Sequence, residues 1–290
     1  MDNNKKKWIY LVVLSIIWGS SFILIKKGLV GLSPIQLGAL RVIITGLILF
    51  AVGHKSLKSI KRKEWKWIVV AGFLGTFFPA FLFAFAETEV DSGIVSILNS
   101  LVPLNTVLLG FAIFKIASTK RQIFGVVIGF VGTTILIANG AKLNPEQNYL
   151  YAGFVILATI MYAINANIIK KHLQEVKPIA IATGNFAAIM IPAIVILLGT
   201  NFFFESNYRK PEVVKSLGYV ILLCTFGTAL AKVMFNKLVQ ISTPVFASSV
   251  TYVMTLVAVL WGLLDGEKIS FVQVIGGVVI LFGVYLANRK

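Results

Sequence analysis

The sequence predicts an all-α integral membrane protein with ten transmembrane helices arranged as two inverted five-helix repeats. Composition, the spacing of apolar stretches and internal repetition support this prediction. Of 290 residues, 58% are hydrophobic and only 13% are charged, whereas about a quarter of the residues of a soluble globular chain are charged. This composition excludes a soluble fold.

Ten apolar stretches divide the chain into predicted spans. A spanning helix needs about 20 mostly apolar residues. Nine of the stretches carry no charge, and the second contains Arg41 alone. The predicted spans are 8–25, 28–54, 67–86, 92–114, 122–141, 147–169, 178–204, 216–231, 238–264 and 269–288.

The net charge of +16 follows the predicted topology. With the N-terminus in the cytoplasm, 19 of the 27 Lys and Arg residues fall in inner connections, Lys232 and Lys237 among them, and 7 fall in outer ones. The positive-inside rule therefore places both termini in the cytoplasm and the chain in the cytoplasmic membrane. Orientation explains the basicity, so we expect contacts with membrane lipids and no nucleic-acid partner.

The N-terminal lysines and the single cysteine allow other interpretations, which the sequence favours less. Lys5-Lys6-Lys7 before an apolar run is also typical of a secretory signal peptide, but no small-residue cleavage site is evident after Ile25, and its removal would leave nine spans. The lone Cys224 lies in the eighth span, so neither a disulfide framework nor a metal-ligand cluster is predicted. We expect no cofactor.

The two halves of the chain match one another. Residues 18–29, which begin Trp18-Gly19-Ser20-Ser21, align at an offset of 144 with residues 162–173. Gly75-Thr76 aligns similarly with Gly227-Thr228. We therefore predict one five-helix repeat over 1–144 and another over 145–290. Because five is odd, the second repeat enters the membrane from the opposite side, which is typical of alternating-access carriers with a central site.

Three stretches resemble the EamA-type branch of the drug/metabolite transporter superfamily: Trp18-Gly19-Ser20-Ser21-Phe22 with Lys26, Ser33-Pro34 to Arg41, and Asp265-Gly266-Glu267-Lys268. The resemblance covers nearly the whole chain. It implies a ten-helix secondary transporter, often an exporter of amino acids, metabolites or drugs. The chain departs from the family pattern at Lys115-Ile116, where a Gly-Glu pair is usual, and at Met254, where a proline is usual.

Polar side chains within the spans are the candidate ligands of a small-molecule substrate. Aromatic faces would pack against the apolar part of a solute while amides orient its polar end. Hydrogen bonding between helices is the alternative interpretation. The candidates are Trp18, Ser21, Asn99, Tyr162, Asn165, Asn185 and Tyr252.

Arg41 is the eighth candidate. It lies seven residues after Pro34, which at about 1.5 Å per residue is about 10 Å below the outer end of its span. An unpaired cation at the bilayer centre costs at least about 2.5 to 3.5 kcal/mol on insertion scales. We expect Arg41 to anchor an acidic group of the solute or to form part of a gate. The alternative is a static ion pair with Glu87, Glu89 or Asp91.

Glycines and prolines predict packing and bends. Small faces on the fifth and tenth spans, formed by Gly125, Gly129, Gly132, Gly276, Gly277 and Gly283, favour close helix packing. Pro34, Pro178 and Pro244 lie at predicted helix starts. Pro79, Pro103 and Pro192 lie inside spans and should kink or break them.

Two other classes of protein were weighed against a carrier. A membrane enzyme needs a nucleophile with a base, paired carboxylates or a metal cluster at one depth, and none is visible, so we do not expect an enzyme. A structural or receptor subunit is not excluded. No P-loop motif is present, which disfavours a nucleotide-driven pump, and a monomer is compatible with the predicted repeats.

Overall fold

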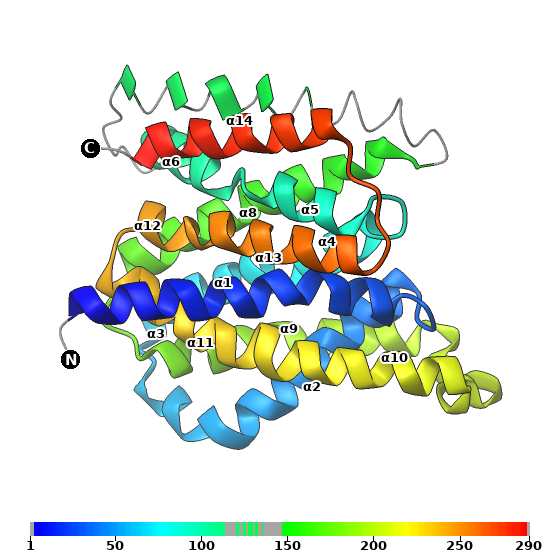
Figure 1. Ribbon diagram of the computed structural model, residues 1–290. Coiled ribbons are helices and arrows are strands. Elements are labelled where there is room, and N and C mark those ends of the chain that lie inside the picture. The colour runs from blue at the N-terminus through cyan, green and yellow to red at the C-terminus, as the bar shows by residue number, and fades with distance from the viewer. Residues whose placement is uncertain are drawn as a thin grey trace.

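The computed structural model describes residues 3–113 and 147–288, together with residues 120, 121, 124, 125, 127, 128, 129, 131, 132 and 135. Within these residues, every regular element is a helix, and the long helices run roughly along one direction (Figure 1). The start of α1 (Asn3–Gly28) and the finish of α14 (Phe271–Asn288) lie at one end of the bundle. We call this the N-terminal end and the opposite end the Lys26 end.

The first half of the described chain crosses the bundle four times. The third crossing contains a π-helical segment, and the fourth consists of two helices. After α1 come α2 (Pro34–Gly53), η1 (His54–Ser59), α3 (Arg62–Gly72), the π-helical η2 (Phe73–Phe77), α4 (Phe78–Ala86), α5 (Ser92–Asn99) and α6 (Val102–Ala112).

The second half repeats this pattern. It begins with η3 (Tyr149–Tyr151), α8 (Ala152–His172), α9 (Pro178–Leu198) and η4 (Asn201–Arg209). It continues with α10 (Pro211–Leu222), the π-helical η5 (Leu223–Leu230), α11 (Ala231–Ile241), α12 (Pro244–Ser248), α13 (Val250–Leu264) and α14.

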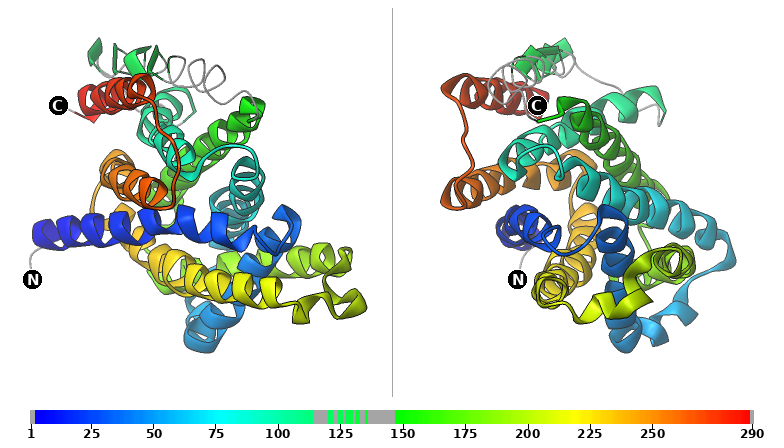
Figure 2. Two further views of the ribbon diagram at one scale, coloured as in Figure 1. Left: turned by 45° about the vertical axis from the view of Figure 1, so that its right-hand side comes forward. Right: turned by 90° about the vertical axis from the view of Figure 1, so that its right-hand side faces the viewer.

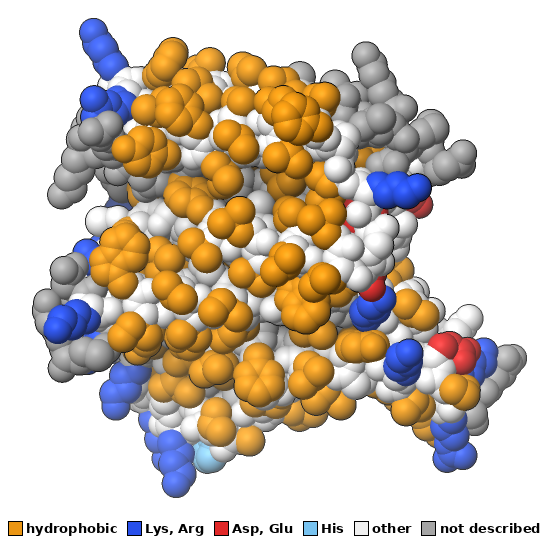
Figure 3. Space-filling view, in the orientation of Figure 1, with side chains coloured by type: hydrophobic (Ala, Val, Ile, Leu, Met, Phe, Trp, Pro, Cys, Tyr) orange, Lys and Arg blue, Asp and Glu red, His pale blue; other side chains and the backbone are white. Residues whose placement is uncertain are grey.

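The described residues contain eight helical segments that are long and apolar enough to cross a membrane. The apolar part of α14, Phe271–Gly283, is shorter and covers the tenth predicted span. The fifth predicted span, 122–141, falls largely outside the described residues. Apolar side chains cover the middle of the bundle and Lys and Arg gather toward its two ends (Figure 3), which is the surface that a multi-pass membrane protein requires.

Several predicted spans, the third and the eighth among them, are longer in the structure because helices continue past charged residues. The third segment begins at Arg62, and the eighth runs over Pro211–Ile241. Lys232 and Lys237 therefore lie within α11, and their assignment to an inner connection was wrong. A lysine does not end a helix when its ammonium group finds an oxygen partner, and Lys232 has one inside the bundle.

Prolines mark two of the three predicted breaks. Pro79 begins α4 directly after the π-helical η2, and Pro103 follows the break between α5 and α6. Pro192 instead lies inside the continuous helix α9. Pro34, Pro178 and Pro244 begin helices as predicted, and Ser33 with Gln36 forms a capping box at the start of α2.

Close contacts between helices depend on small residues. α1 packs along α13 and against α10 and α11 (Figures 1 and 2). A Cβ atom on Gly19 of α1 would lie 2.7 Å from the Met254 carbonyl oxygen of α13. A Cβ atom on Gly283 of α14 would lie 2.6 Å from the Gly125 carbonyl oxygen, so the small faces predicted for the fifth and tenth spans do meet.

We predict that the N-terminal end faces the cytoplasm. Ser59 in η1 and Asn148 before η3 are both exposed, and the chain order places them at opposite ends of the bundle. Single cysteines at these positions in a Cys224→Ala background should react differently with an impermeant maleimide added to intact cells. Asn148→Cys should be labelled and Ser59→Cys protected until the cells are opened. Labelling of Ser59→Cys in intact cells would contradict this orientation.

Candidate binding cavity

A cavity of about 110 Å³ lies in the centre of the bundle. Helices from both halves line it, and its walls are mostly apolar and aromatic. The residues that line it are Trp18, Ser21, Phe22, Ile25, Arg41, Gly75, Thr76, Phe83, Asn99, Val102, Tyr162, Asn165, Gly227, Thr228, Lys232, Phe235, Ala247, Ser248, Val250, Thr251 and Met254. This volume has room for several water molecules or one small solute.

Six of the eight predicted site residues line this cavity. Trp18 and Ser21 come from α1 and Arg41 from α2, whereas Asn99 ends α5. Tyr162 and Asn165 come from α8. Residues separated by more than 140 positions in the sequence therefore converge on one cavity.

The other two predicted residues lie elsewhere. Asn185 is buried between α9 and α3, where its side-chain amide donates a hydrogen bond of 2.6 Å to the Ile68 carbonyl oxygen. Tyr252 lies beside the cavity-lining Thr251 but does not line the cavity. Adjacent helical residues point about 100° apart, so similar depth in the membrane did not give these two residues the same facing.

Two carbonyl groups of the π-helical segments accept hydrogen bonds from polar side chains. Pro79 has no N–H to donate to the Gly75 carbonyl four residues earlier, and the Lys232 ammonium donates to this oxygen at 2.9 Å. The backbone N–H of Ala231 bonds to the carbonyl oxygens of Phe226 and Thr228, and not to that of Gly227 four residues earlier. The Trp18 indole N–H then donates to the Gly227 oxygen at 2.9 Å.

The glycines of these segments bring matching side chains into contact with the backbone. A Cβ atom on Gly75 would lie 2.5 Å from the side-chain amide carbon of Asn165, and one on Gly227 would lie 2.6 Å from the Ser21 hydroxyl. Gly75 aligns with Gly227, and Ser21 aligns with Asn165, in the internal repeat. The same contact therefore forms twice, each time between the two halves of the chain.

Lys232 is the cavity residue that the sequence interpretation missed. Lys232 is only 6% exposed, and it lies one turn beyond Thr228 in the same helical segment. The signal that could have found it is the internal repeat. At the spacing that aligns Gly75 with Gly227, Lys232 falls on Ala80, which lies well inside the third predicted span.

Arg41 forms no ion pair with an acidic side chain in the described part of the chain. Its Nε donates to the Thr228 hydroxyl at 3.1 Å. The predicted partner Glu87 is buried, and neither of its carboxyl oxygens has a hydrogen-bond partner among the described residues. Burial, together with the charge of Glu267, holds the pKa of Glu87 well above its ordinary value, against the opposing influence of Arg41 and Lys26.

Two carboxamide oxygens at the cavity have no hydrogen-bond partner among the described residues. Asn99 and Asn165 are 5% and 2% exposed, and the Oδ1 atom of each is buried and unpaired, as is the Thr76 hydroxyl. Buried polar groups in native proteins are nearly always hydrogen-bonded. Unpaired amides around a cavity are therefore the groups expected to bind a polar solute.

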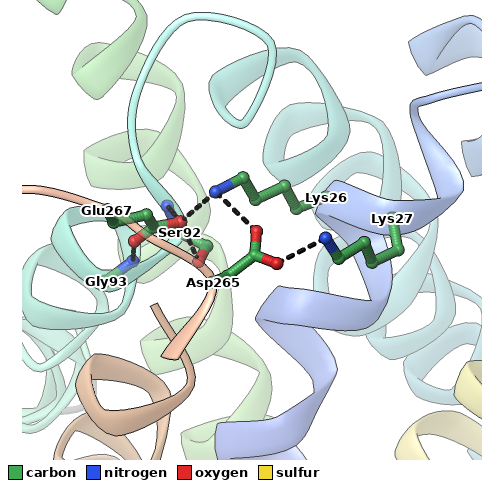
Figure 4. A network of polar contacts seen from close by, with 6 residues as sticks. All are labelled: Lys26, Lys27, Ser92, Gly93, Asp265 and Glu267. Atoms are coloured by element: carbon green, nitrogen blue, oxygen red, sulfur yellow. Dashed lines mark hydrogen bonds and ion pairs between the residues drawn. The ribbon is translucent and has the colours of Figure 1, made fainter. Parts of the chain in front are cut away.

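An ion-pair network closes the Lys26 end of the bundle (Figure 4). The Lys26 ammonium lies 2.8 Å from Glu267 and 3.0 Å from Asp265, which also pairs with Lys27. The Glu267 carboxylate accepts hydrogen bonds from the first backbone N–H groups of α5, at Ser92 and Gly93, and from the Ser92 hydroxyl. Glu267 thus ties α1 and α5 to the connection between α13 and α14.

The network sets the ionisation of its acids. Burial alone would raise the pKa of Glu267, but hydrogen bonds from Lys26, Ser92 and Gly93 outweigh it and hold the pKa below its ordinary value. The hydrogen bond from Lys27 lowers the pKa of Asp265, and Lys26 adds to the effect. Both acids are therefore ionised at neutral pH.

A second tie lies at the N-terminal end. Lys170 of α8 donates to the carbonyl oxygens of Gln240 and Ser242 at 3.2 and 2.7 Å. The Gln240 side chain in turn donates to the Leu173 and Val176 carbonyls. Lys170 aligns with Lys26 in the internal repeat, so equivalent lysines tie opposite ends of the bundle.

Comparison with known proteins identifies the family. The sequence pattern of the EamA-like transporter family matches residues 6–138 and 150–289. The chain belongs to this family. A protein of Archaeoglobus fulgidus named an uncharacterized transporter is 25% identical over 294 residues, which cover 98% of this chain and 99% of the relative. The inner membrane transporter YedA of Escherichia coli K12, also named as uncharacterized, is 27% identical over 285 residues, with 96% of this chain and 89% of the relative covered.

One solved crystal structure shares the fold. It superposes with a TM-score of 0.68 over 98% of this chain and 96% of its own, at 16% sequence identity. At this identity the likeness concerns the fold alone. The family match, the relatives and the membrane-crossing helices together make the chain a multi-pass membrane transporter.

The contact between Gly227 and Ser21 gives a test of the cavity geometry. We expect Gly227→Ala to destabilise the protein by about 1–3 kcal/mol, because the new methyl group overpacks against Ser21. Combining it with Ser21→Ala, which removes the oxygen in the way, should restore part of the loss. The measurement is thermal unfolding of the purified protein in detergent.

Gly218→Ala in the neighbouring α10 is the matched control. A Cβ atom there meets nothing within 4 Å, so this substitution should stabilise the helix by about 0.5–1 kcal/mol. Equal effects of Gly218→Ala and Gly227→Ala on the unfolding temperature would show that the close approach at Gly227 is not formed.

Proposed function

We propose that the protein is a secondary transporter that exports small metabolites, such as amino acids or related compounds, or drugs, by alternating access. The substrate site is the central cavity, between two inverted repeats. The observation that carries the proposal is that equivalent residues of both halves line this cavity: Trp18 with Tyr162, Ser21 with Asn165, Gly75 with Gly227, and Thr76 with Thr228.

The paired contacts support the inverted repeat. The face of α1 that carries Ser21 meets η5, and the equivalent face of α8 that carries Asn165 meets η2. A two-fold axis in the membrane plane relates such crossed contacts, as in carriers built from inverted repeats. Two repeats with the same fold can each adopt the conformation of the other. When they do so, the cavity that was open to one side of the membrane opens to the other side.

The ties at the two ends support the direction of transport. The Lys26 end is held by ion pairs between charged side chains, whereas Lys170 at the N-terminal end bonds to backbone carbonyl groups. In each ion pair at the Lys26 end both partners are ionised, whereas at the N-terminal end only the Lys170 ammonium is charged, so the Coulomb attraction is stronger at the Lys26 end. With the N-terminal end in the cytoplasm, the cytoplasmic side then opens more readily, which suits a protein that collects its substrate from the cell.

Transport by purified protein in liposomes tests the proposal. The liposomes are loaded with a mixture of metabolites. We expect particular metabolites to leave liposomes that contain the protein faster than they leave protein-free liposomes. Asn99→Ala and Asn165→Ala should lower that rate at least tenfold, because each removes a buried polar contact with the solute. Asn148→Ala, an exposed amide outside the cavity, is the control and should transport normally.

Two results would count against this function. If liposomes with the wild-type protein release no metabolite faster than protein-free liposomes, the protein is not a transporter of these metabolites. Normal rates in both cavity variants would leave transport in place but move the substrate site out of this cavity.

The Lys26 end gives a further prediction. Glu267→Gln should destabilise the protein by roughly 1–3 kcal/mol at pH 7, because it removes the charge to which three residues of α1 and α5 donate. The pKa of Glu267 is depressed in the folded protein, so its contribution is fully present above the ordinary Glu pKa of about 4.3 and is lost as the pH falls through the folded value.

The measurement is the unfolding temperature of both proteins between pH 7 and pH 3.5. The difference between wild type and Glu267→Gln should shrink toward acid pH. Glu212→Gln, at an exposed acid at the start of α10, should change little throughout. A difference that stays constant down to pH 3.5 would contradict the ionised tie.

A further inference from the structure

Two cations face the cavity without an acid beside them. Arg41 of α2 and Lys232 of α11 both line it, and no Asp or Glu is among its lining residues in the described part of the chain. Arg41 belongs to the first half of the chain and Lys232 to the second. Like charges in a water-poor site repel each other strongly, so this cavity favours the entry of negative charge.

Neither cation is neutralised by the groups it contacts. The Lys232 ammonium has three donors, and one of them bonds to the Gly75 carbonyl. The Arg41 guanidinium donates from Nε to Thr228, and it forms no ion pair with a carboxylate among the described residues. Donors therefore remain on both side chains for the oxygens of a solute, and planar guanidinium groups match carboxylate and phosphate oxygens in particular.

The unpaired carboxamide oxygens at the cavity indicate which other groups the solute carries. Asn99 and Asn165 can each donate and accept hydrogen bonds, and both are buried at the same cavity. Their oxygens fit hydroxyl or amide donors on the solute. An ammonium group on the solute would instead be a third cation in a site without a carboxylate.

We propose that the transported solute carries a net negative charge, as a small carboxylate or phosphate ester with hydroxyl groups, and that Arg41 and Lys232 bind its acidic group from the two halves of the protein. This inference rests on the proposed transport function and narrows its substrate class. A zwitterion such as a free amino acid is a poor fit, because its ammonium group has no acidic partner.

Selective release from proteoliposomes of the full chain tests the charge class. The liposomes contain four-carbon solutes of similar size at equal concentration: malate and succinate as dianions, erythronate as a hydroxylated monoanion, 4-aminobutyrate as a zwitterion and 1,4-diaminobutane as a dication. Glycerol 3-phosphate represents the phosphate esters. Mass spectrometry of the released solutes should show an anion-to-zwitterion ratio of at least ten.

Variants connect this ratio to the two cations. Arg41→Gln and Lys232→Gln should each lower the release of anions about 10- to 100-fold, the usual size of one charged hydrogen bond, and Arg41→Lys should restore part of it. Lys237→Gln, in the same helix but away from the cavity, should leave the ratio unchanged. Lys232→Glu should shift the ratio toward the zwitterion. Because a ratio compares solutes within one preparation, partial loss of folded protein does not alter it.

The outcomes separate this inference from the function on which it rests. Release of the zwitterion or the dication in preference to the anions would overturn the anionic substrate and leave the transporter in place. An anion preference that survives in both Gln variants would overturn the role of Arg41 and Lys232. If no solute or metabolite leaves the proteoliposomes faster than it leaves protein-free liposomes, the transport function itself would be overturned.

Discussion

A cation inside the hydrocarbon layer needs oxygen atoms around it, and this requirement organises the centre of the protein. The Lys232 ammonium finds the Gly75 carbonyl oxygen, which is available because Pro79 cannot donate to it. The proline, the π-helical turn and the buried lysine therefore depend on one another. With an N–H donor in place of Pro79, a straight α-helix would satisfy that carbonyl internally and leave Lys232 with its desolvation cost uncompensated.

The second half solves the same problem with different residues. Gly227 has its carbonyl released by the register of η5, and the Trp18 indole fills the position that Lys232 fills at Gly75. The backbone irregularity is thus common to both halves, whereas the side chain that meets it differs. Irregular backbone in a membrane protein is tolerated where it lines a cavity, and both segments do so here.

The sequence predicted the parts of this structure that follow from polarity along the chain. Apolar stretches predicted the eight described spans. The glycines of the fifth and tenth spans predicted close helix packing, and Gly125 and Gly283 do approach closely. Internal repetition pointed to the facing pairs at the cavity. Hydropathy alone could not place Lys232, because a charged residue ends an apolar stretch of sequence. In the structure the helix continues, and the Lys232 ammonium bonds to the Gly75 carbonyl oxygen within the bundle.

Other features depend on packing that polarity does not encode. Asn185 and Tyr252 have the expected depth but face other neighbours, because rotation about the helix axis is set by tertiary contacts. Glu87 is near Arg41 in the predicted topology, but in the described part of the chain the two side chains form no ion pair. The tie through Glu267 depends on the fold of the connection after α13, where Gly266 adopts a positive φ of 86°.

Alternating access requires that one cavity be reached in turn from the two sides of the membrane. Thr251 lines the cavity, so the most direct measurement is the labelling of Thr251→Cys, in a Cys224→Ala background, by an impermeant thiol reagent applied to each side of proteoliposomes in turn. We expect labelling from both sides and protection by the same transported solute in each case. Labelling from one side only, whether or not solute is present and whether or not Glu267 is replaced, would contradict it.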